Sequence, residues 1–190
     1  DEADLDKALE TFDELSRPAR RLENTASDVY EHFWTYFDAR DWDAVAGLLT
    51  EDISNDDRRR VVNAGIERGR DIQMANLRRL TDIGAAVSSS VIATRGDHLI
   101  LNRIRTANSD LRVGEFDSEM LNIIETDADG RIAAGVLFDA EDIDAAFAEL
   151  DTRYLAGEAA AHVHAWSLVA QTYAAFNRHE VVPPSPDWAS

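Results

Sequence analysis

Four long strand-like segments, which follow one another between residues 85 and 138, constrain the fold of this chain more than any other feature. They are Ala85–Thr94, His98–Thr106, Glu115–Thr126 and Arg131–Phe138. The first pair is separated by Arg95-Gly96-Asp97 and the last pair by Asp127-Ala128-Asp129-Gly130. Both separators are short, polar and contain a glycine, which is typical of β-hairpin turns. The segments therefore predict a curved antiparallel meander.

Helical patterns lie only before and after the meander. Apolar residues at helical spacing predict helices over residues 1–15, from Thr25 onward, and over 42–49, 69–83, 139–154 and 159–177. Thr25 and Asp28 have the spacing of a capping box at the start of the second helix. Glu51-Asp52 is expected to end the helix over 42–49, and one or two short strands are expected between residues 53 and 66. Gly84 is placed to cap the helix over 69–83.

The pattern of the meander predicts the fold class. Helices should cover one face of a curved antiparallel sheet, giving an α+β cone with extra helices at both termini. The other face is also partly apolar, because Leu99 and Leu101 alternate with Ile100 and Ile104. We therefore expect a second copy of the domain to cover that face.

A long-period repeat divides the chain. The acidic segment 1–9 matches 139–147 with an offset of about 138 positions, and Trp34–Phe37 is echoed by Tyr173–Phe176 at nearly the same offset. We expect residues 1–22 to end a preceding repeat, 23–157 to form one complete domain, and 158–190 to begin a following repeat. Such a repeat predicts tandem copies within a larger protein.

Composition narrows the function classes. The formal net charge is −18, which makes nucleic acid and anionic membranes poor partners. There is no cysteine, so disulfides and thiolate chemistry are excluded. The acidic N-terminus is unlike a secretory signal, and no apolar run is long enough to span a membrane. A cytoplasmic protein is the expectation.

Three stretches resemble the nuclear transport factor 2-like, or SnoaL-like, superfamily. They are the aromatic helix and its sequel over Tyr30–Ile53, the helix start Gly69-Arg70-Asp71, and the hairpin Glu119–Asp139. The order of elements over about Asn24–Asp139 also resembles that superfamily. The resemblance implies a conical sheet with a pocket beneath a helix layer. The repeated ends resemble tandem SnoaL-like units of large multidomain bacterial proteins.

The resemblance also implies where ligands and substrates would bind. Ligand-binding candidates are Tyr30, Phe33, Trp34, Phe37, Asn102 and Asn122. Catalytic candidates, by analogy with isomerases, cyclases and hydrolases of the superfamily, are Asp57, Glu119 and Tyr30. The epoxide hydrolases need an Arg-x-Asp on a strand, but this chain has Arg103-Ile104-Arg105 there. Plain packing of the aromatic residues is the competing interpretation. If the pocket is catalytic, Asp57 or Glu119 should have a raised pKa.

Metal and cofactor signals are weak. Asp127–Gly130 resembles the start of a calcium loop, but Val136 stands where that loop needs a glutamate, so a hairpin turn is expected. His162 and His164 would point to different helix faces. No phosphate-binding glycine motif or serine-nucleophile motif occurs. We expect no metal and no cofactor.

The expected function is therefore a noncatalytic SnoaL-like module that binds a small apolar ligand or a sister domain within a larger regulatory protein. One alternative is a small-molecule isomerase, cyclase or hydrolase with a carboxylate base in the pocket. The other is a dimerisation scaffold. For the binding module and for the scaffold, we expect a homodimer or a sister-domain contact through the sheet.

Overall fold

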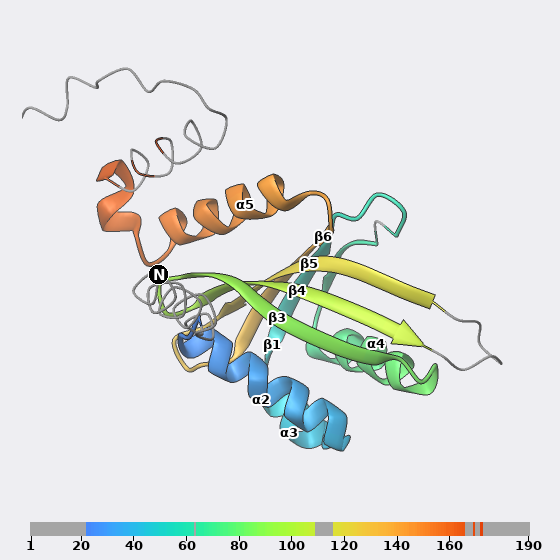
Figure 1. The fold of residues 1–190 in the computed structure, drawn as a ribbon. Coiled ribbons are helices and arrows are strands. Elements are labelled where there is room, and N and C mark those ends of the chain that lie inside the picture. Colours follow the sequence, from blue (N-terminus) through green and yellow to red (C-terminus); the bar gives the residue numbers. More distant parts are fainter. Residues whose placement is uncertain (1–21, 63, 109–115, 166–168, 170–171, 173–190) are drawn as a thin grey trace, which may run out of the picture.

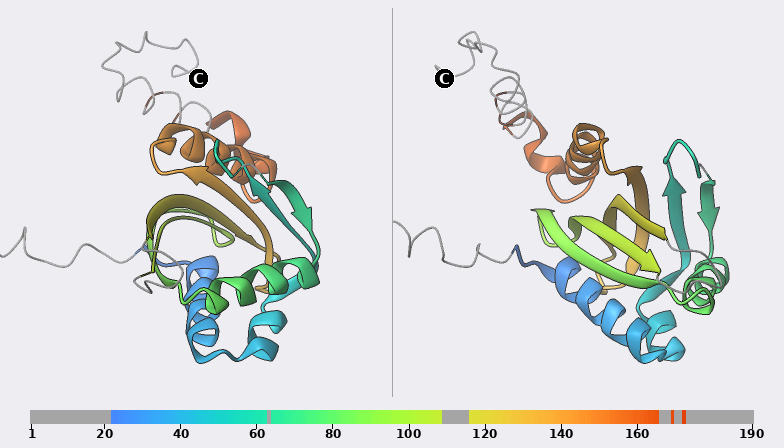
Figure 2. Two further views of the ribbon diagram at one scale, coloured as in Figure 1. Left: turned by 90° about the vertical axis from the view of Figure 1, so that its right-hand side faces the viewer. Right: turned by 45° about the vertical axis from the view of Figure 1, so that its right-hand side comes forward.

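A computed structural model describes residues 22–62, 64–108, 116–165, 169 and 172. It contains a six-stranded sheet with the order β2-β1-β6-β5-β4-β3 (Figure 1). The sheet is strongly curved, and helices pack on both of its faces (Figure 2). The predicted α+β fold with a curved, cone-like sheet is confirmed.

The predicted meander is confirmed. It consists of the strands β3 (Ala86–Arg95), β4 (Leu99–Asn108), β5 (Phe116–Thr126) and β6 (Ile132–Asp139), each antiparallel to the next. Gly96 and Gly130 occupy the hairpin turns with φ of 54° and 73°, a region that side-chain-bearing residues rarely adopt. The predicted turn at Asp127–Gly130 is also confirmed, because Asp127 accepts hydrogen bonds from the backbone N–H groups of Asp129 and Arg131.

The region after the second helix differs from the prediction. The short helix α3 (Trp42–Gly47) ends earlier than expected, and β1 (Leu49–Asp57) begins at once. Glu51 and Asp52 lie exposed within β1 and do not break a helix before a polar segment. β1 is antiparallel to β2 (Gly65–Arg68) but parallel to β6, so the sheet is mixed. The parallel pairing joins segments far apart in sequence, and the local pattern carried no signal for it.

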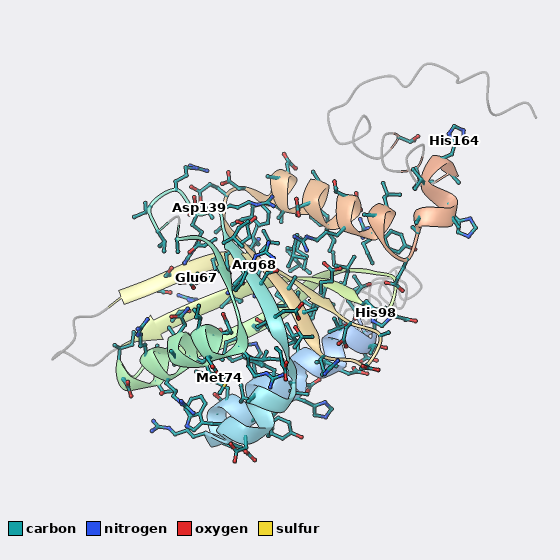
Figure 3. All side chains as sticks on the ribbon, turned by 180° about the vertical axis from the view of Figure 1, so that it is seen from behind. Glu67, Arg68, Met74, His98, Asp139 and His164 are labelled. Atoms are coloured by element: carbon teal, nitrogen blue, oxygen red, sulfur yellow. The ribbon has the colours of Figure 1, made fainter. Side chains whose placement is uncertain are left out.

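Three helices cover the concave, inner face of the sheet. They are α2 (Thr25–Ala39), α3 and α4 (Arg70–Asp82). The predicted capping box is displaced by one residue: Asn24 is the N-cap and exchanges hydrogen bonds with Ser27, in place of Thr25 and Asp28. Figure 3 shows Met74 of α4 and Glu67 of β2, and Glu67 accepts a 2.8 Å hydrogen bond from Asn76 of α4. The inner core combines apolar side chains of these helices with those of β1 and the meander, including Phe33, Leu49, Ile100 and Ile124.

The convex, outer face is covered by this chain's own helix α5 (Ile143–Ala156). Ala146 and Leu150 of α5 are fully buried against Leu101, Leu121 and other residues of β3 to β6. The expectation that another copy of the domain covers the apolar outer face is therefore wrong, since the last helix of the domain folds back onto it. Beyond α5 comes a short 3₁₀ helix (Ala160–His162).

Several predictions fall outside the described residues. They are the helix over 1–15 and most of the helix over 159–177, which includes the repeat match at Tyr173–Phe176. The repeat and the division at residues 22 and 158 stay predictions. Within the described part of the chain, no helix is long and apolar enough to cross a membrane.

Candidate functional site

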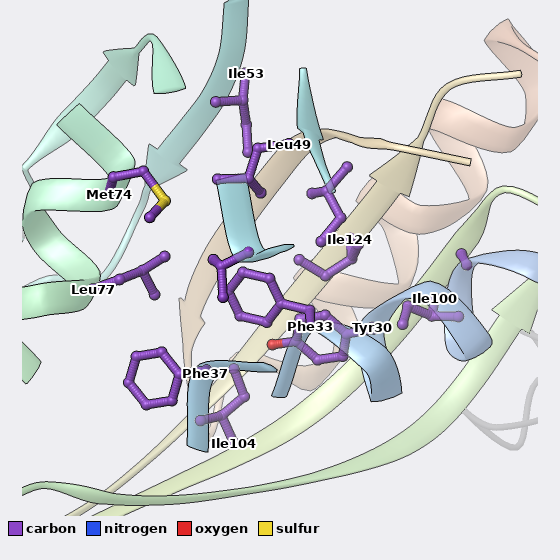
Figure 4. Packing of buried hydrophobic residues seen from close by; sticks show 13 residues of the cluster. Tyr30, Phe33, Phe37, Leu49, Ile53, Met74, Leu77, Ile100, Ile104 and Ile124 are labelled. Atoms are coloured by element: carbon purple, nitrogen blue, oxygen red, sulfur yellow. The ribbon is translucent and has the colours of Figure 1, made fainter. Parts of the chain in front are cut away.

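A cavity of about 410 Å³ lies between the inner face of the sheet and helices α2 and α4. Figure 4 shows the apolar side chains that surround this region, with Tyr30 and Phe33 of α2, Leu77 of α4, and Leu49, Ile53 and Ile124 of the sheet. A cavity of this size and lining is typical of small-molecule sites.

One wall of the cavity is aromatic. Tyr30, Phe33 and Trp34 line it, and their rings contact one another at centroid distances of 5.2 to 5.8 Å. These three predicted ligand-binding residues do lie together at the cavity. Phe37 lies one turn further on, buried against Trp34 and Trp42, and is not part of the lining.

Two predicted polar residues occupy neighbouring strands but face different hollows. Asn102 and Asn122 are paired across β4 and β5. Asn122 lines the cavity and donates a 3.3 Å hydrogen bond from Nδ2 to the Tyr30 hydroxyl. Asn102 is fully buried and lines a separate groove beside β3. The Oδ1 atoms of both side chains are buried, and neither has a hydrogen-bond partner among the residues that the structure describes.

The Tyr30 hydroxyl is held neutral deep in the protein. Burial raises the pKa of Tyr30 to about 12, and the hydrogen bond from Asn122 offsets the rise only in part. Tyr30 therefore stays protonated at neutral pH and can donate or accept a hydrogen bond. With Asn122 beside it, it can hold one oxygen of a bound molecule.

A further amide pair, which sequence reasoning missed, lines the same cavity. Asn55 on β1 donates a 3.2 Å hydrogen bond to Oε1 of Gln73 on α4. Gly135 on β6 makes room for this, because a Cβ there would collide with Oδ1 of Asn55. Glycine inside a strand is a signal of such a close approach, and it could have drawn attention to residue 135.

Asp57 lies in the cavity lining, but its negative charge is paired with the positive charge of Arg59. Nε and Nη2 of Arg59 donate to its two carboxylate oxygens at 2.9 and 2.7 Å, and the Arg59 backbone N–H adds a third hydrogen bond. Burial would raise the pKa of Asp57, but the hydrogen bonds and charge of Arg59 outweigh it and lower the pKa. This shift is opposite to that expected of a catalytic base. The Asp-x-Arg spacing at a strand end was the available signal for the pair.

Glu119 does not reach the cavity. It is exposed on the outer side of β5 and forms an ion pair with Arg103 of β4. Its neighbour Met120 faces the cavity instead, where Nη1 of Arg59 points at the Met120 sulfur at 3.6 Å. The alternation along β5 excludes Glu119 from any chemistry in this cavity.

Metal ligation has no support in the described residues. Over 22–62, 64–108 and 116–165, no group of three or more histidine, aspartate or glutamate side chains is arranged to hold a metal ion. The cavity supplies hydrogen-bonding groups from Tyr30, Asn55 and Asn122, and its charged side chains are already bonded within the protein, Asp57 to Arg59 and both Glu67 and Arg79 to Asn76. Such a lining can bind and orient a largely apolar molecule with one or two polar atoms.

The arrangement of a helix layer over a curved sheet with a cavity between them is the fold of nuclear transport factor 2-like proteins. No protein-family profile and no curated protein matches this sequence. Solved structures do match. The chain is similar to a Mycobacterium tuberculosis protein, RV0760c, in complex with estradiol-17beta-hemisuccinate, with a TM-score of 0.53 and 11% identity over 60% of this chain and 93% of that one.

Two further structures have the same fold. One is SalBIII, an epoxide hydrolase/cyclase-like enzyme of pyran ring formation in the polyether salinomycin, with a TM-score of 0.51 and 11% identity over 60% of this chain and 88% of that one. The other is a computationally designed 17-OHP binder, with a TM-score of 0.52 and 11% identity over 63% of this chain and 94% of that one. Similarity at this identity shows the shared fold alone.

Proposed function

We propose that this chain is a noncatalytic binding module that holds one small, largely apolar molecule in the cavity beneath α2 and α4. The observation that carries the proposal is that the cavity is walled by apolar side chains while its buried carboxylate, Asp57, is already bound at both oxygens by Arg59. A general base must be free to take a proton, and Asp57 is not.

The hydrogen-bonding groups define what the molecule should look like. Asn122 is hydrogen-bonded to Tyr30 and Asn55 to Gln73, and the two asparagine side chains lie near each other over Gly135. A rigid apolar body with an oxygen toward Tyr30 fits this distribution. Two of the structural neighbours are RV0760c in complex with estradiol-17beta-hemisuccinate and a designed 17-OHP binder, which supports the same class of ligand.

A small-molecule isomerase, cyclase or hydrolase is the second candidate. The neutral Tyr30 hydroxyl beside the Asn122 amide favours it, because such donors stabilise a developing oxyanion. That reaction would require a substrate that displaces Arg59 from Asp57.

The experiment uses native mass spectrometry and equilibrium dialysis. Native spectra of the purified chain should show a bound small molecule, and 17-hydroxyprogesterone serves as the dialysis probe. Leu80→Trp adds bulk at a half-buried position of the cavity lining, and Val163→Trp adds the same bulk at an exposed position away from it. We expect Leu80→Trp to abolish binding and Val163→Trp to leave it unchanged.

The outcomes separate the two candidates. Equal binding by both variants would contradict the cavity as the site. Recovery of the probe chemically altered, with the change lost in Asp57→Asn, would replace the binding module by the enzyme.

The setting of the module stays a prediction. We propose tandem copies in a larger cytoplasmic regulatory protein, associated by a homodimer or sister-domain contact, with a dimerisation scaffold as the alternative role. The relatives cover only 60 to 63% of this chain, which leaves room for such additional segments. Light scattering of the purified chain would measure the oligomeric state.

A further inference from the structure

A second hollow lies beside the cavity, between helix α2 and strand β3. This groove has a volume of about 570 Å³, and Tyr30 and Trp34 form the wall between it and the cavity, because both residues line both spaces. Its lining runs from Leu22 to Asp38, along the whole of α2. Fifteen helical residues span about 22 Å, which is the length of about six residues of extended peptide.

The strand that borders the groove is an unprotected sheet edge. β3 is the last strand of the sheet, and no strand of the described residues pairs with its free side. From Ala86 to Thr94 it carries no charge and no proline, and Ser88–Ser90 is exposed. The opposite edge, β2, has only four residues and includes Glu67 and Arg68. Natural proteins usually protect long edge strands with charges or prolines, so the absence of both from Ala86 to Thr94 marks this part of β3 as a pairing surface.

The helical side of the groove is acidic. Glu23, Asp28, Glu31 and Asp38 line it, and no lysine or arginine is among the described residues that line it. Asp28 and Asp38 are exposed and have no ion-pair partner within the described part of the chain. This surface attracts a cationic partner.

A buried, unpaired acceptor lies at the floor of the groove. Asn102 is fully buried and lines the groove, and its Oδ1 has no hydrogen-bond partner. Nδ2 of Asn102 lies 3.5 Å from the backbone oxygen of Asn122 on β5. A buried acceptor without a partner is costly to the folded state.

We propose that the groove between α2 and β3 is a docking site for an extended, basic peptide segment that adds a strand to the free edge of β3. Its backbone pairs with β3, and alternate arginine or lysine side chains extend toward Asp28 and Asp38. This site is separate from the small-molecule cavity and does not depend on it.

Charge favours such a peptide over a second copy of this chain. Pairing of β3 with its own counterpart across a two-fold axis would continue the sheet and place two acidic α2 helices on the same side of the junction. Like charges so placed repel, and the whole chain carries a net charge of −18. A basic segment is attracted by the acidic α2 helix and by the net negative charge of the chain, where a second copy would be repelled by both.

The test measures binding of fluorescein-labelled acetyl-(Arg-Val)4-amide to the purified chain by fluorescence anisotropy. Because any strongly acidic protein attracts a cationic peptide, the variants must match in charge. Asp28→Asn/Asp38→Asn removes two carboxylates from the groove. Asp144→Asn/Asp52→Asn removes two exposed carboxylates from α5 and β1, which do not line it. We expect the groove variant to weaken binding at least about fivefold and the control less than about twofold.

Two further measurements test strand pairing. A version of the peptide with alternate amides N-methylated keeps its charge but loses backbone donors, and Ser90→Lys places a charge on the edge of β3. Both should weaken binding, and circular dichroism confirms that each variant is folded. The proposal would be overturned if the two double variants bound the peptide equally well. It would also be overturned if the N-methylated peptide or spermine bound the chain as tightly as the unmodified peptide. A dimer by light scattering that Ser90→Lys dissociates would overturn it as well, because a second copy would then occupy the edge.

Discussion

The two faces of the sheet are both apolar, yet they are packed in different ways. On the outer face, α5 packs closely against the apolar part of the sheet, with Leu121, Ile123 and Leu150 fully buried. Ion pairs from Arg58 to Glu149 and from Arg153 to Glu125 hold the helix in place. On the inner face, the helices leave a cavity of about 410 Å³ and two buried amide oxygens without partners. The outer face is therefore the more tightly packed of the two, and the inner face leaves an open cavity and unsatisfied polar atoms.

The largest expected effect is on the outer face. Leu150→Ala removes a fully buried side chain from a tightly packed layer and should lower the free energy of unfolding by about 3 kcal/mol. Leu80→Ala, at a half-buried position that faces the cavity, should cost about half as much or less. Urea denaturation measures both. Equal losses would show that the two faces are packed alike and would break the comparison.

The next effect concerns the charge at the cavity. Asp57→Asn removes the charge-assisted hydrogen bonds with Arg59 and should cost about 1.5 to 3 kcal/mol at pH 7. Because the pKa of Asp57 is lowered in the folded state, its contribution is fully present above the ordinary aspartate pKa and is lost as the pH falls through the folded pKa. The stability difference between the chain and Asp57→Asn should therefore shrink only below about pH 4.

Urea melts between pH 3 and pH 7 test this dependence, with Asp52→Asn as the control because Asp52 is exposed on the same strand. A difference that persists unchanged at pH 3 would argue against ionic pairing of Asp57 and Arg59.

The smallest effect has the opposite sign. Asn122→Leu removes a buried oxygen that has no partner and should raise the free energy of unfolding by about 1 kcal/mol, although it also removes the contact with Tyr30. The same variant should bind 17-hydroxyprogesterone more weakly, measured by equilibrium dialysis. A variant that loses stability without losing binding would mean that Asn122 serves packing alone.

The sequence predicted the elements whose signals are local. The hairpin glycines at 96 and 130 and the aromatic spacing of Tyr30, Phe33 and Trp34 are readable within a few residues. The position of β1 was missed, because its parallel pairing with β6 has no short-range signature. Glu119 was placed in the pocket although its strand alternates with Met120 and Asn122, and the strict alternation was the better guide.

The candidate site was predicted only in part for the same reason. Asn55, Arg59 and Gln73 join the cavity because β1 and α4 are brought against the end of the meander. Their spacing along the chain says little about that assembly. The prediction for the outer face was wrong because an apolar face can be buried either by a second copy or by a helix of the same chain. Here α5 of the same chain buries it.

The parallel pairing of β1 with β6 has a kinetic consequence. Asp56 pairs with Val136, so this contact closes a loop of about 80 residues, whereas every pairing within the meander joins neighbouring segments. Local contacts form with a smaller entropic penalty than distant ones. The meander and α5 should therefore organise first during folding, and the wall that carries Asn55 and Asp57 should close last. In native-state hydrogen exchange, the amides of β1 and β2 should then open at lower free energy than those of β4 and β5.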